Sequence, residues 1–332
     1  GLAEATALIV KLFSGVISDI TGKRKTLALI GYGLAALTKP LFPLASSLSL
    51  VIAARVIDRI GKGIRGAPRD ALVADLAPPD RRGEAFGLRQ SLDSVGAFLG
   101  PLIAMGLMLI SHDDFSFVFW IACLPAFISV ATLFAFVPER NAATKSTSNL
   151  PLALSSLRAL PPAFWIALTI SAIVSFARIS DAFLILRASD LGLPLAGAPF
   201  VLIAMNIVYA IAAWPAGRWA DRLPRRLLLS LGVSALATGS LSLAYATSLY
   251  GVALGIIFWG LHLAVTQGLF AKWIADAAPP ALRGTAFGLF NLVGGVAMLM
   301  GNGLTGWIWD ADGAESAFLL SALTAAALLF TW

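Results

Sequence analysis

The sequence predicts an all-α polytopic membrane protein, and three observations support this. Of its 332 residues, 58% are hydrophobic and only 13% are charged, whereas a soluble domain carries about a quarter charged residues. The apolar residues form eleven blocks, each roughly 18–25 residues long, which is enough for a helix to cross about 30 Å of hydrocarbon. The chain also repeats itself. Because lipid offers the backbone no hydrogen-bond partners, such blocks fold as helices and not as open sheets.

The repeat is visible at two separate places. The string DALVADLAPPDRRGEAFGL at 70–88 returns as AKWIADAAPPALRGTAFGL at 271–289, an offset of 201 residues. The Gly-x-x-x-Asp of Gly15 and Asp19 returns as Gly217 and Asp221, an offset of 202 residues. Two landmarks with nearly the same offset indicate an internal duplication. The sequence therefore predicts two pseudo-symmetric halves.

The expected helices follow from the apolar blocks. In chain order they are 1–18, 26–46, 49–73, 85–110, 115–137, 163–188, 197–219, 226–246, 249–275, 283–308 and 314–332. We expect an N-terminal bundle at 1–137, a polar linker at 138–162 and a C-terminal bundle at 163–332. Shifting 163–188 back by the repeat offset places a helix before residue 1. The prediction is thus a twelve-helix parent of two six-helix bundles, with helix 1 absent from this chain and the last helix shortened.

The distribution of basic residues among the loops predicts the orientation of the chain in the membrane. Lys and Arg gather in the short loops of one side and in the linker, and this side should be cytoplasmic. The net charge of +6 is explained by these loops, so nucleic acid is not an expected partner. The single Cys123 excludes an intrachain disulfide. No P-loop, serine elbow or metal-ligand spacing is present, so we expect neither an enzyme nor a cofactor or metal.

The string GVISDITGKRK at 15–25 resembles the loop 2–3 signature of the major facilitator superfamily. Gly15 allows a close helix approach, and Asp19 lies beside Lys23 and Arg24. The resemblance implies a gate latch in the outward-open state. The second copy is looser, with Pro224 in the region of the central glycine, and its candidates are Gly217, Asp221, Arg225 and Arg226. The alternative is a plain turn whose basic residues only set orientation.

The string ARVIDRIGKGIRGAPRD resembles the helix 4 signature of this superfamily, an Arg followed by a Gly-rich stretch. Arg55 fits the signature position best, and Arg59 fits an alternative frame. Charges inside a bilayer cost about 2.5–3.5 kcal/mol each on insertion scales, so they face a partner or a wet cavity. Arg55, Asp58 and Arg59 are therefore candidates for proton coupling or substrate binding. A structural ion-pair cluster is the alternative.

A third resemblance lies in the helix at 85–110. Gly96, Gly100 and Pro101 match the first part of the superfamily's antiporter signature, while Ala104 and Met105 replace its last two glycines. Gly-x-x-x-Gly permits tight packing, and the proline provides a bend. The resemblance implies exchange with protons. The alternative is an ordinary tight helix crossing.

Other ionisable residues within apolar blocks are weaker candidates for coupling or substrate binding. Arg178 and Asp181 lie three residues apart, so either function or a local ion pair is open. His262 is a candidate proton carrier because a histidine side chain ordinarily titrates near neutral pH, although a hydrogen-bonded packing histidine is the commoner case. The fourth candidate is Glu4, which shares a helix face with Lys11. Arg89 and Asp93, four residues apart, are expected to form a local ion pair.

Together these features predict a secondary transporter that works by alternating access. The working hypothesis is proton-coupled efflux of a small apolar or cationic molecule. The expected partners are this substrate, protons and the bilayer of a bacterial inner membrane, with the chain acting as a monomer. Two alternatives stay open: symport or uniport of a nutrient, and a non-transporting receptor on the same fold.

Overall fold

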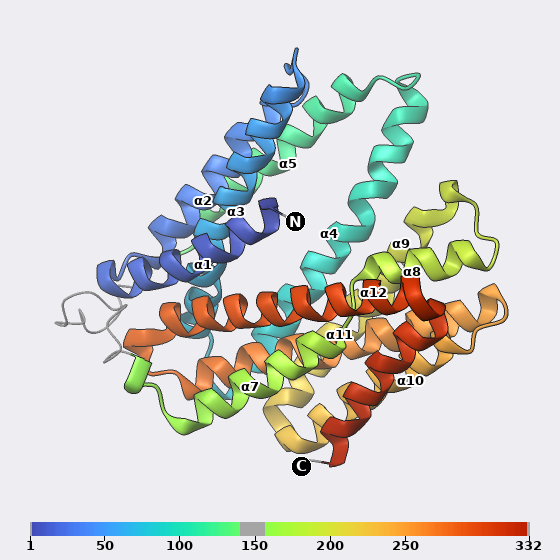
Figure 1. Ribbon diagram of the computed structural model, residues 1–332. Coiled ribbons are helices and arrows are strands. Elements are labelled where there is room, and N and C mark those ends of the chain that lie inside the picture. The colour runs from blue at the N-terminus through green and yellow to red at the C-terminus, as the bar shows by residue number, and fades with distance from the viewer. Residues whose placement is uncertain (1, 140–156, 331–332) are drawn as a thin grey trace. The chain divides into compact units, whose positions relative to one another are not determined.

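The computed structural model describes residues 2–139 and 157–330, and every regular element in this part of the chain is helical (Figure 1). The all-α prediction is confirmed. In chain order the elements are α1 Leu2–Thr21, α2 Arg24–Thr38, η1 Lys39–Leu41, α3 Leu48–Leu76, η2 Pro79–Arg81, α4 Arg82–Ile110, α5 Phe115–Phe136, α7 Pro162–Ala177, α8 Asp181–Asp190, η3 Leu195–Gly197, α9 Ala198–Arg222, α10 Arg225–Ala244, α11 Leu249–Ala277, η4 Pro280–Leu282 and α12 Arg283–Phe330.

Seven helical segments among the described residues are long and apolar enough to cross a membrane. The surface agrees with this, because large apolar side chains are exposed along them. Leu109 on α4 is 80% exposed and Phe136 at the end of α5 is 81% exposed. A soluble monomer rarely presents such continuous apolar surface, whereas lipid tails cover it at no cost. The chain is therefore an integral, multi-pass membrane protein.

The chain divides into two compact units. The first holds Gly1–Leu76, Leu102–Trp165 and Ile274–Leu292, and the second holds Ala77–Pro101, Ile166–Trp273 and Val293–Trp332. Each unit contains a segment from both predicted sequence halves, and the boundary inside α4 falls at Pro101. The predicted division at 138–162 stays a prediction, since residues 140–156 lie outside the described part.

In the first unit α3 packs against α1 and α2, and α2 packs against α5. Glycines make the close approach possible. A Cβ on Gly63 of α3 would lie 2.6 Å from the Cβ of Val10 on α1, and one on Gly61 would lie 2.8 Å from the carbonyl oxygen of Gly31 on α2. Small residues at such crossings let helix backbones approach in a membrane. The Gly-rich stretch of α3 thus has a packing role.

In the second unit the helix expected at 163–188 is broken. α7 ends at Ala177 and α8 begins at Asp181. The Oγ of Ser180 accepts a hydrogen bond from the backbone N–H of Ala182 and so caps α8. The N–H of Ser180 itself donates to Oδ1 of Asn302 on α12 at 2.7 Å. A continuous helix was the wrong expectation, because these polar contacts satisfy the backbone groups that a break frees.

Two further boundaries differ from the expected ones. The helix expected at 26–46 ends as α2 at Thr38, because Pro40 lacks the N–H that an α-helix needs and a short 3₁₀ turn follows. The helices expected at 283–308 and 314–332 join without a loop in α12. Gly313 joins them with φ 86° and ψ 179°, a conformation essentially restricted to glycine.

Candidate functional site

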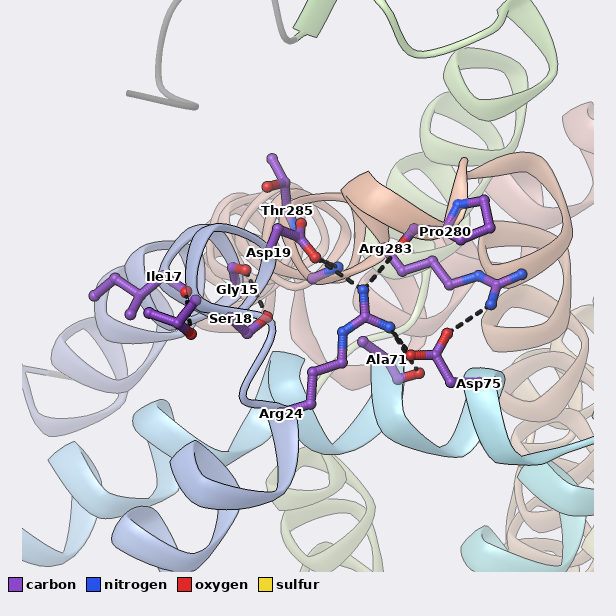
Figure 2. Close-up of polar contacts among 12 residues, drawn as sticks. Gly15, Ile17, Ser18, Asp19, Arg24, Ala71, Asp75, Pro280, Arg283 and Thr285 are labelled. Carbon is purple, nitrogen blue, oxygen red and sulfur yellow. Dashed lines mark hydrogen bonds and ion pairs between the residues drawn. The ribbon is translucent and has the colours of Figure 1, made fainter. Parts of the chain in front are cut away.

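The first candidate site surrounds Asp19, near the end of α1 (Figure 2). Its carboxylate accepts hydrogen bonds from the backbone N–H groups of Gly284 at 2.9 Å and Thr285 at 2.6 Å. These are N–H groups of the first turn of α12, which have no partner within the helix. The positive end of the α12 dipole also stabilises the negative charge of the Asp19 carboxylate. Asp19 on α1 therefore caps α12, which comes from the other predicted half of the sequence.

Arg24, the first residue of α2, binds the same carboxylate. Its Nη2 lies 3.0 Å from Oδ1 of Asp19 and donates to the carbonyl oxygen of Pro280 at 2.8 Å. Its Nη1 pairs with Asp75 on α3. The Arg24 side chain is fully buried. One planar guanidinium thus joins α1, α3 and the approach to α12, which the compact ammonium of a lysine cannot reproduce.

Asp75 closes the network. Its Oδ1 lies 2.6 Å from Nη1 of Arg283, the first residue of α12, while its other oxygen takes Arg24. Two carboxylates and two guanidinium groups therefore balance in one cluster, as Figure 2 shows. We call Asp19, Arg24, Asp75 and Arg283, with the N–H groups of Gly284 and Thr285, the first capping site.

A glycine contact brings α1 and α12 close enough for this capping. A Cβ added to Gly15 would overlap the carbonyl oxygen of Gly284, and one added to Gly284 would overlap that of Gly15. The two backbones touch, so neither position accepts a side chain without separating the helices. Gly22 then ends the turn in the left-handed region, with φ 68°.

The repeat reproduces this arrangement in the second unit. Asp221 near the end of α9 accepts hydrogen bonds from the N–H groups of Gly83 and Glu84, each at 2.8 Å, in the first turn of α4. Backbones again touch, here between Gly217 and Gly83. We call Asp221 and Lys272, with the N–H groups of Gly83 and Glu84, the second capping site. Each acid caps a helix of the other sequence half.

The cations of the two sites differ. Nζ of Lys272 lies 3.6 Å from Oδ1 of Asp221, at the margin of an ion pair. Arg225 and Arg226, expected to serve the second copy, are both exposed, and Arg225 lies over the ring of Trp273 at 5.6 Å. Lys23, expected to help in the first copy, is exposed as well. The structure thus brings Asp19 and Arg24 together but places the other three basic residues at the surface.

A separate charge cluster lies in the first unit on α3. Asp58 is 6% exposed, and its two oxygens take different cations: Nζ of Lys39 at 3.1 Å and Nη2 of Arg59 at 3.2 Å. Lys39 comes from the 3₁₀ turn after α2 and was not anticipated. Arg55 is exposed. Of the three candidates on this helix, Asp58 and Arg59 form one cluster and Arg55 stands outside it.

The antiporter-like motif on α4 is placed differently from expectation. A Cβ on Gly96 or Gly100 would meet no atom within 4 Å in the described part of the structure, so these glycines make no tight crossing there. The expectation of close packing at these two positions is wrong for this structure. Pro101 is an exposed residue inside α4 and ends the segment assigned to the second unit.

The remaining candidates lie mostly in the second unit. Arg178 occupies the break between α7 and α8, and Asp181 starts α8, where its Oδ1 accepts a hydrogen bond from Nε1 of Trp259 at 3.3 Å. No ion pair joins Arg178 and Asp181 among the described residues, so that expected alternative is wrong. The expected pair of Arg89 and Asp93 is found, at 3.0 Å.

His262 is 1% exposed on α11, and its Nδ1 lies 2.8 Å from the carbonyl oxygen of Gly232 on α10. The backbone of Glu4 lies in α1, but its side chain is outside the described part. The neighbouring Lys11 donates from Nζ to Oδ1 of Asn291 on α12 at 3.2 Å. His262 therefore has the packing contact that the alternative interpretation expected, and its second nitrogen has no hydrogen-bond partner among described residues.

Sequence reasoning missed five residues that the sites use. They are Lys39, Asp75, Lys272, Arg283 and Thr285. A signal existed for four of them, because Asp75, Lys272, Arg283 and Thr285 belong to the duplicated string at 70–88 and 271–289. That string was used to find the repeat, and it also supplies the capped helix starts.

Comparison with known proteins agrees with this architecture. The chain is 28% identical over 335 residues to the uncharacterized MFS-type transporter MJ1317 of Methanocaldococcus jannaschii, covering 98% of this chain and 82% of that protein. It is 27% identical over 320 residues to the multidrug resistance protein MdtH of Photorhabdus laumondii, covering 93% of this chain and 76% of that protein.

Two solved structures have the same fold. The human organic anion transporter MFSD10 superposes with a TM-score of 0.82 at 19% identity, covering 99% of this chain and 81% of that chain. The E. coli fucose:proton symporter FucP superposes with a TM-score of 0.81 at 18% identity, covering 99% and 89%. Residues 1–302 match the Major Facilitator Superfamily itself. The chain belongs to the Major Facilitator Superfamily and is a membrane transporter, not an enzyme.

Proposed function

We propose that this transporter exports a small molecule in exchange for protons, with Asp58 as the proton-carrying acid. The observation that carries the proposal is the buried carboxylate of Asp58 between two cations, Lys39 and Arg59. An acid held this way changes its partners when it changes charge. The multidrug resistance protein MdtH, a relative at 27% identity, favours export as the direction.

Proton exchange would work through the competition for this carboxylate. When Asp58 is ionised it holds both cations. When it takes a proton, the attraction to Lys39 and Arg59 is lost and the two cations repel one another. Lys39 has a side chain that is 36% exposed, so it is free to move toward water. Movement of the turn at Lys39–Leu41 would then couple protonation to the packing of α2 on α3.

The capping sites supply the second element of alternating access. We infer from the positive-inside rule that the basic loops and the 138–162 linker face the cytoplasm, and the turns after Asp19 and Asp221 are among these loops. Each site joins helices of the two sequence halves, so cytoplasmic opening must break both. Release of Asp19 and Asp221 from the helix starts they cap is the expected step between the two access states.

Transport in proteoliposomes with an imposed pH gradient tests this function. The fluorescent cation ethidium and the fluorescent anion fluorescein serve as probes, and trapped pyranine reports proton movement. We expect probe movement that stops when the gradient is collapsed. Gradient-independent movement would contradict coupling and favour uniport, while movement in the same direction as protons would favour symport.

Asp58→Asn is the decisive variant. It keeps the size of the side chain but cannot exchange a proton, so proton movement should no longer accompany probe movement. Asp113→Asn is the matched control, because Asp113 is exposed in the turn after α4 and its φ of 67° suits asparagine. Full coupling in Asp58→Asn would transfer the role to another acid.

A further inference from the structure

Arg178 is a cation inside the apolar part of the second unit, and it forms no ion pair with an acid in the described part of the chain. It follows the last residue of α7, in the break before α8. Its Nη2 donates a hydrogen bond to the sulfur of Met298 on α12 at 3.4 Å, and its Nε has no hydrogen-bond partner among the described residues. A guanidinium group offers five N–H donors in a planar fork. Thioether sulfur is a weak acceptor, so most of this donor capacity is unused.

A guanidinium group without hydrogen-bond acceptors raises the free energy of the folded protein at this position. Charged side chains within membrane-spanning segments are normally paired with an acid or with carbonyl groups. Arg187, in the last turn of α8, follows that rule and donates to the carbonyl oxygens of Leu243, Ala244 and Ala246 at 2.9–3.0 Å. The described residues give Arg178 no such set of carbonyl groups, although its side chain is only partly exposed.

The nearest acid does not neutralise it. Asp181 lies three residues further along the chain, beyond the break, and its Oδ1 accepts a hydrogen bond from the indole N–H of Trp259. Asp93 is similarly occupied, since it pairs with Arg89 on α4. Both acids therefore already have partners, while the fork of Arg178 stays open.

The second unit also holds a buried phenol. Tyr209 of α9 is 9% exposed. α4 and α9 touch here, because Ser91 donates to the carbonyl oxygen of Ala210 at 2.5 Å. Arg89 with its acid and the phenol of Tyr209 therefore lie on two neighbouring helices of the unit that also holds Arg178.

We propose that Arg178 receives an anionic group, such as a carboxylate, of the transported molecule. A carboxylate matches the planar fork with two parallel hydrogen bonds, and it would supply the missing counter-charge. This inference rests on the proposed function for the idea that a solute reaches the site, and it names the substrate class. It replaces the apolar or cationic molecule expected from sequence with one that carries a negative charge.

Binding to the detergent-solubilised full chain, without a pH gradient, tests the proposal separately from coupling. The probes are paired aromatic carboxylates and their amides, 2-naphthoate with 2-naphthamide and benzoate with benzamide. Quenching of tryptophan fluorescence reports binding, since Trp259 contacts Asp181 within the site. We expect the carboxylates to bind and the amides to bind at least about tenfold more weakly. Equal binding of both, or no binding of either carboxylate, would overturn the proposal.

Variants then identify the residue. Arg178→Gln should weaken carboxylate binding about tenfold, and Arg178→Lys should restore part of it because it keeps the charge but loses the fork. Asp181→Asn should strengthen binding, because a nearby negative charge is removed. Arg158→Gln is the matched control, an exposed arginine near the start of α7.

Thermal stability distinguishes a binding role from a structural one. Removing an uncompensated cation should leave the Tm of the ligand-free protein unchanged or raise it. A carboxylate affinity that Arg178→Gln leaves intact, or a Tm that falls in this variant while binding is unaffected, would assign Arg178 to structure and reject the anion site.

Discussion

At the scale of single residues, the two capping acids look alike in sequence but differ in their surroundings. Asp19 is 1% exposed and is held by a fully buried arginine that also binds Asp75. Asp221 has only a marginal contact with Lys272 at 3.6 Å. Removal of one partner from a buried ion pair is costly because the other charge stays behind. The first site should therefore be the more sensitive to neutralisation.

We predict that Asp19→Asn destabilises the first capping site by about 3 kcal/mol, because the charge of Arg24 loses one of its two acids. Asp221→Asn should cost about 1 kcal/mol, the usual loss at a helix cap. Thermal melting in detergent measures both, with Asp113→Asn as the control. Equal falls in Tm would show that the arginine adds nothing to the first site.

A second residue-scale prediction concerns the fork of Arg24. Arg24→Lys keeps the charge, but one ammonium cannot reach Asp19, Asp75 and the Pro280 carbonyl together. We expect a lower Tm for this variant, whereas Lys23→Gln at the exposed neighbour should leave it unchanged. Hydrogen exchange at Gly284 and Thr285 should rise only in Arg24→Lys. Unchanged exchange there would contradict the role given to this arginine.

At the scale of elements, glycines have two distinct roles in these helices. Some lie where two backbones touch, as Gly15 does against Gly284. Others, such as Gly96, Gly100 and Gly106 on α4, would meet nothing within 4 Å if a Cβ were added. The sequence motif alone does not separate the two kinds, because both occur in small-residue patterns.

Substitution by alanine should separate them. Gly15→Ala should lower the Tm, because α1 and α12 must move apart and the hydrogen bonds to Asp19 lengthen. Gly106→Ala on α4 should leave the Tm unchanged or raise it, since alanine favours a helix by about 0.5–1 kcal/mol over glycine. A tolerated Gly15→Ala would show that the contact between α1 and α12 is loose.

The break between α7 and α8 is the other element-scale feature. Asn302 occupies the position that corresponds to Pro101 in the repeat, and its side chain accepts from the N–H of Ser180. Asn302→Ala should therefore leave this N–H without its acceptor and raise hydrogen exchange at Ser180 and Ala182. Asn291→Ala, earlier on the same helix, is the control. Unchanged exchange in Asn302→Ala would mean that the break needs no support from α12.

At the scale of the whole molecule, the duplication produces reciprocal contacts. An acid on α1 caps α12, and the corresponding acid on α9 caps α4. The two sites share no residue, so their contributions to stability should add. We predict that the Tm loss of the double variant Asp19→Asn/Asp221→Asn equals the sum of the two single losses within measurement error. A clearly smaller loss would show that breaking one site already opens the other.

Much of the fold could be predicted because a membrane-spanning helix is specified by a run of consecutive apolar residues. The apolar blocks are long enough to span a membrane, and they determined the helical class and the order of helices. The repeat offset, seen at Asp19 and again at Asp75, determined the duplicated architecture. Local chemistry also predicted the pairing of Asp19 with Arg24, since the two are five residues apart across a tight turn. The family follows from the same motifs.

Only the tertiary structure decided which charges meet. Asp58 forms an ion pair with Lys39 and not with Arg55. Asp75 pairs with Arg283, which lies 208 residues away in the sequence. The helix break could not be predicted either, because the N–H of Ser180 in the break is held by Asn302, 122 residues further along the chain. Periodicity and hydropathy report on neighbours within a few turns, whereas the energy of a buried charge depends on atoms that folding brings from distant helices.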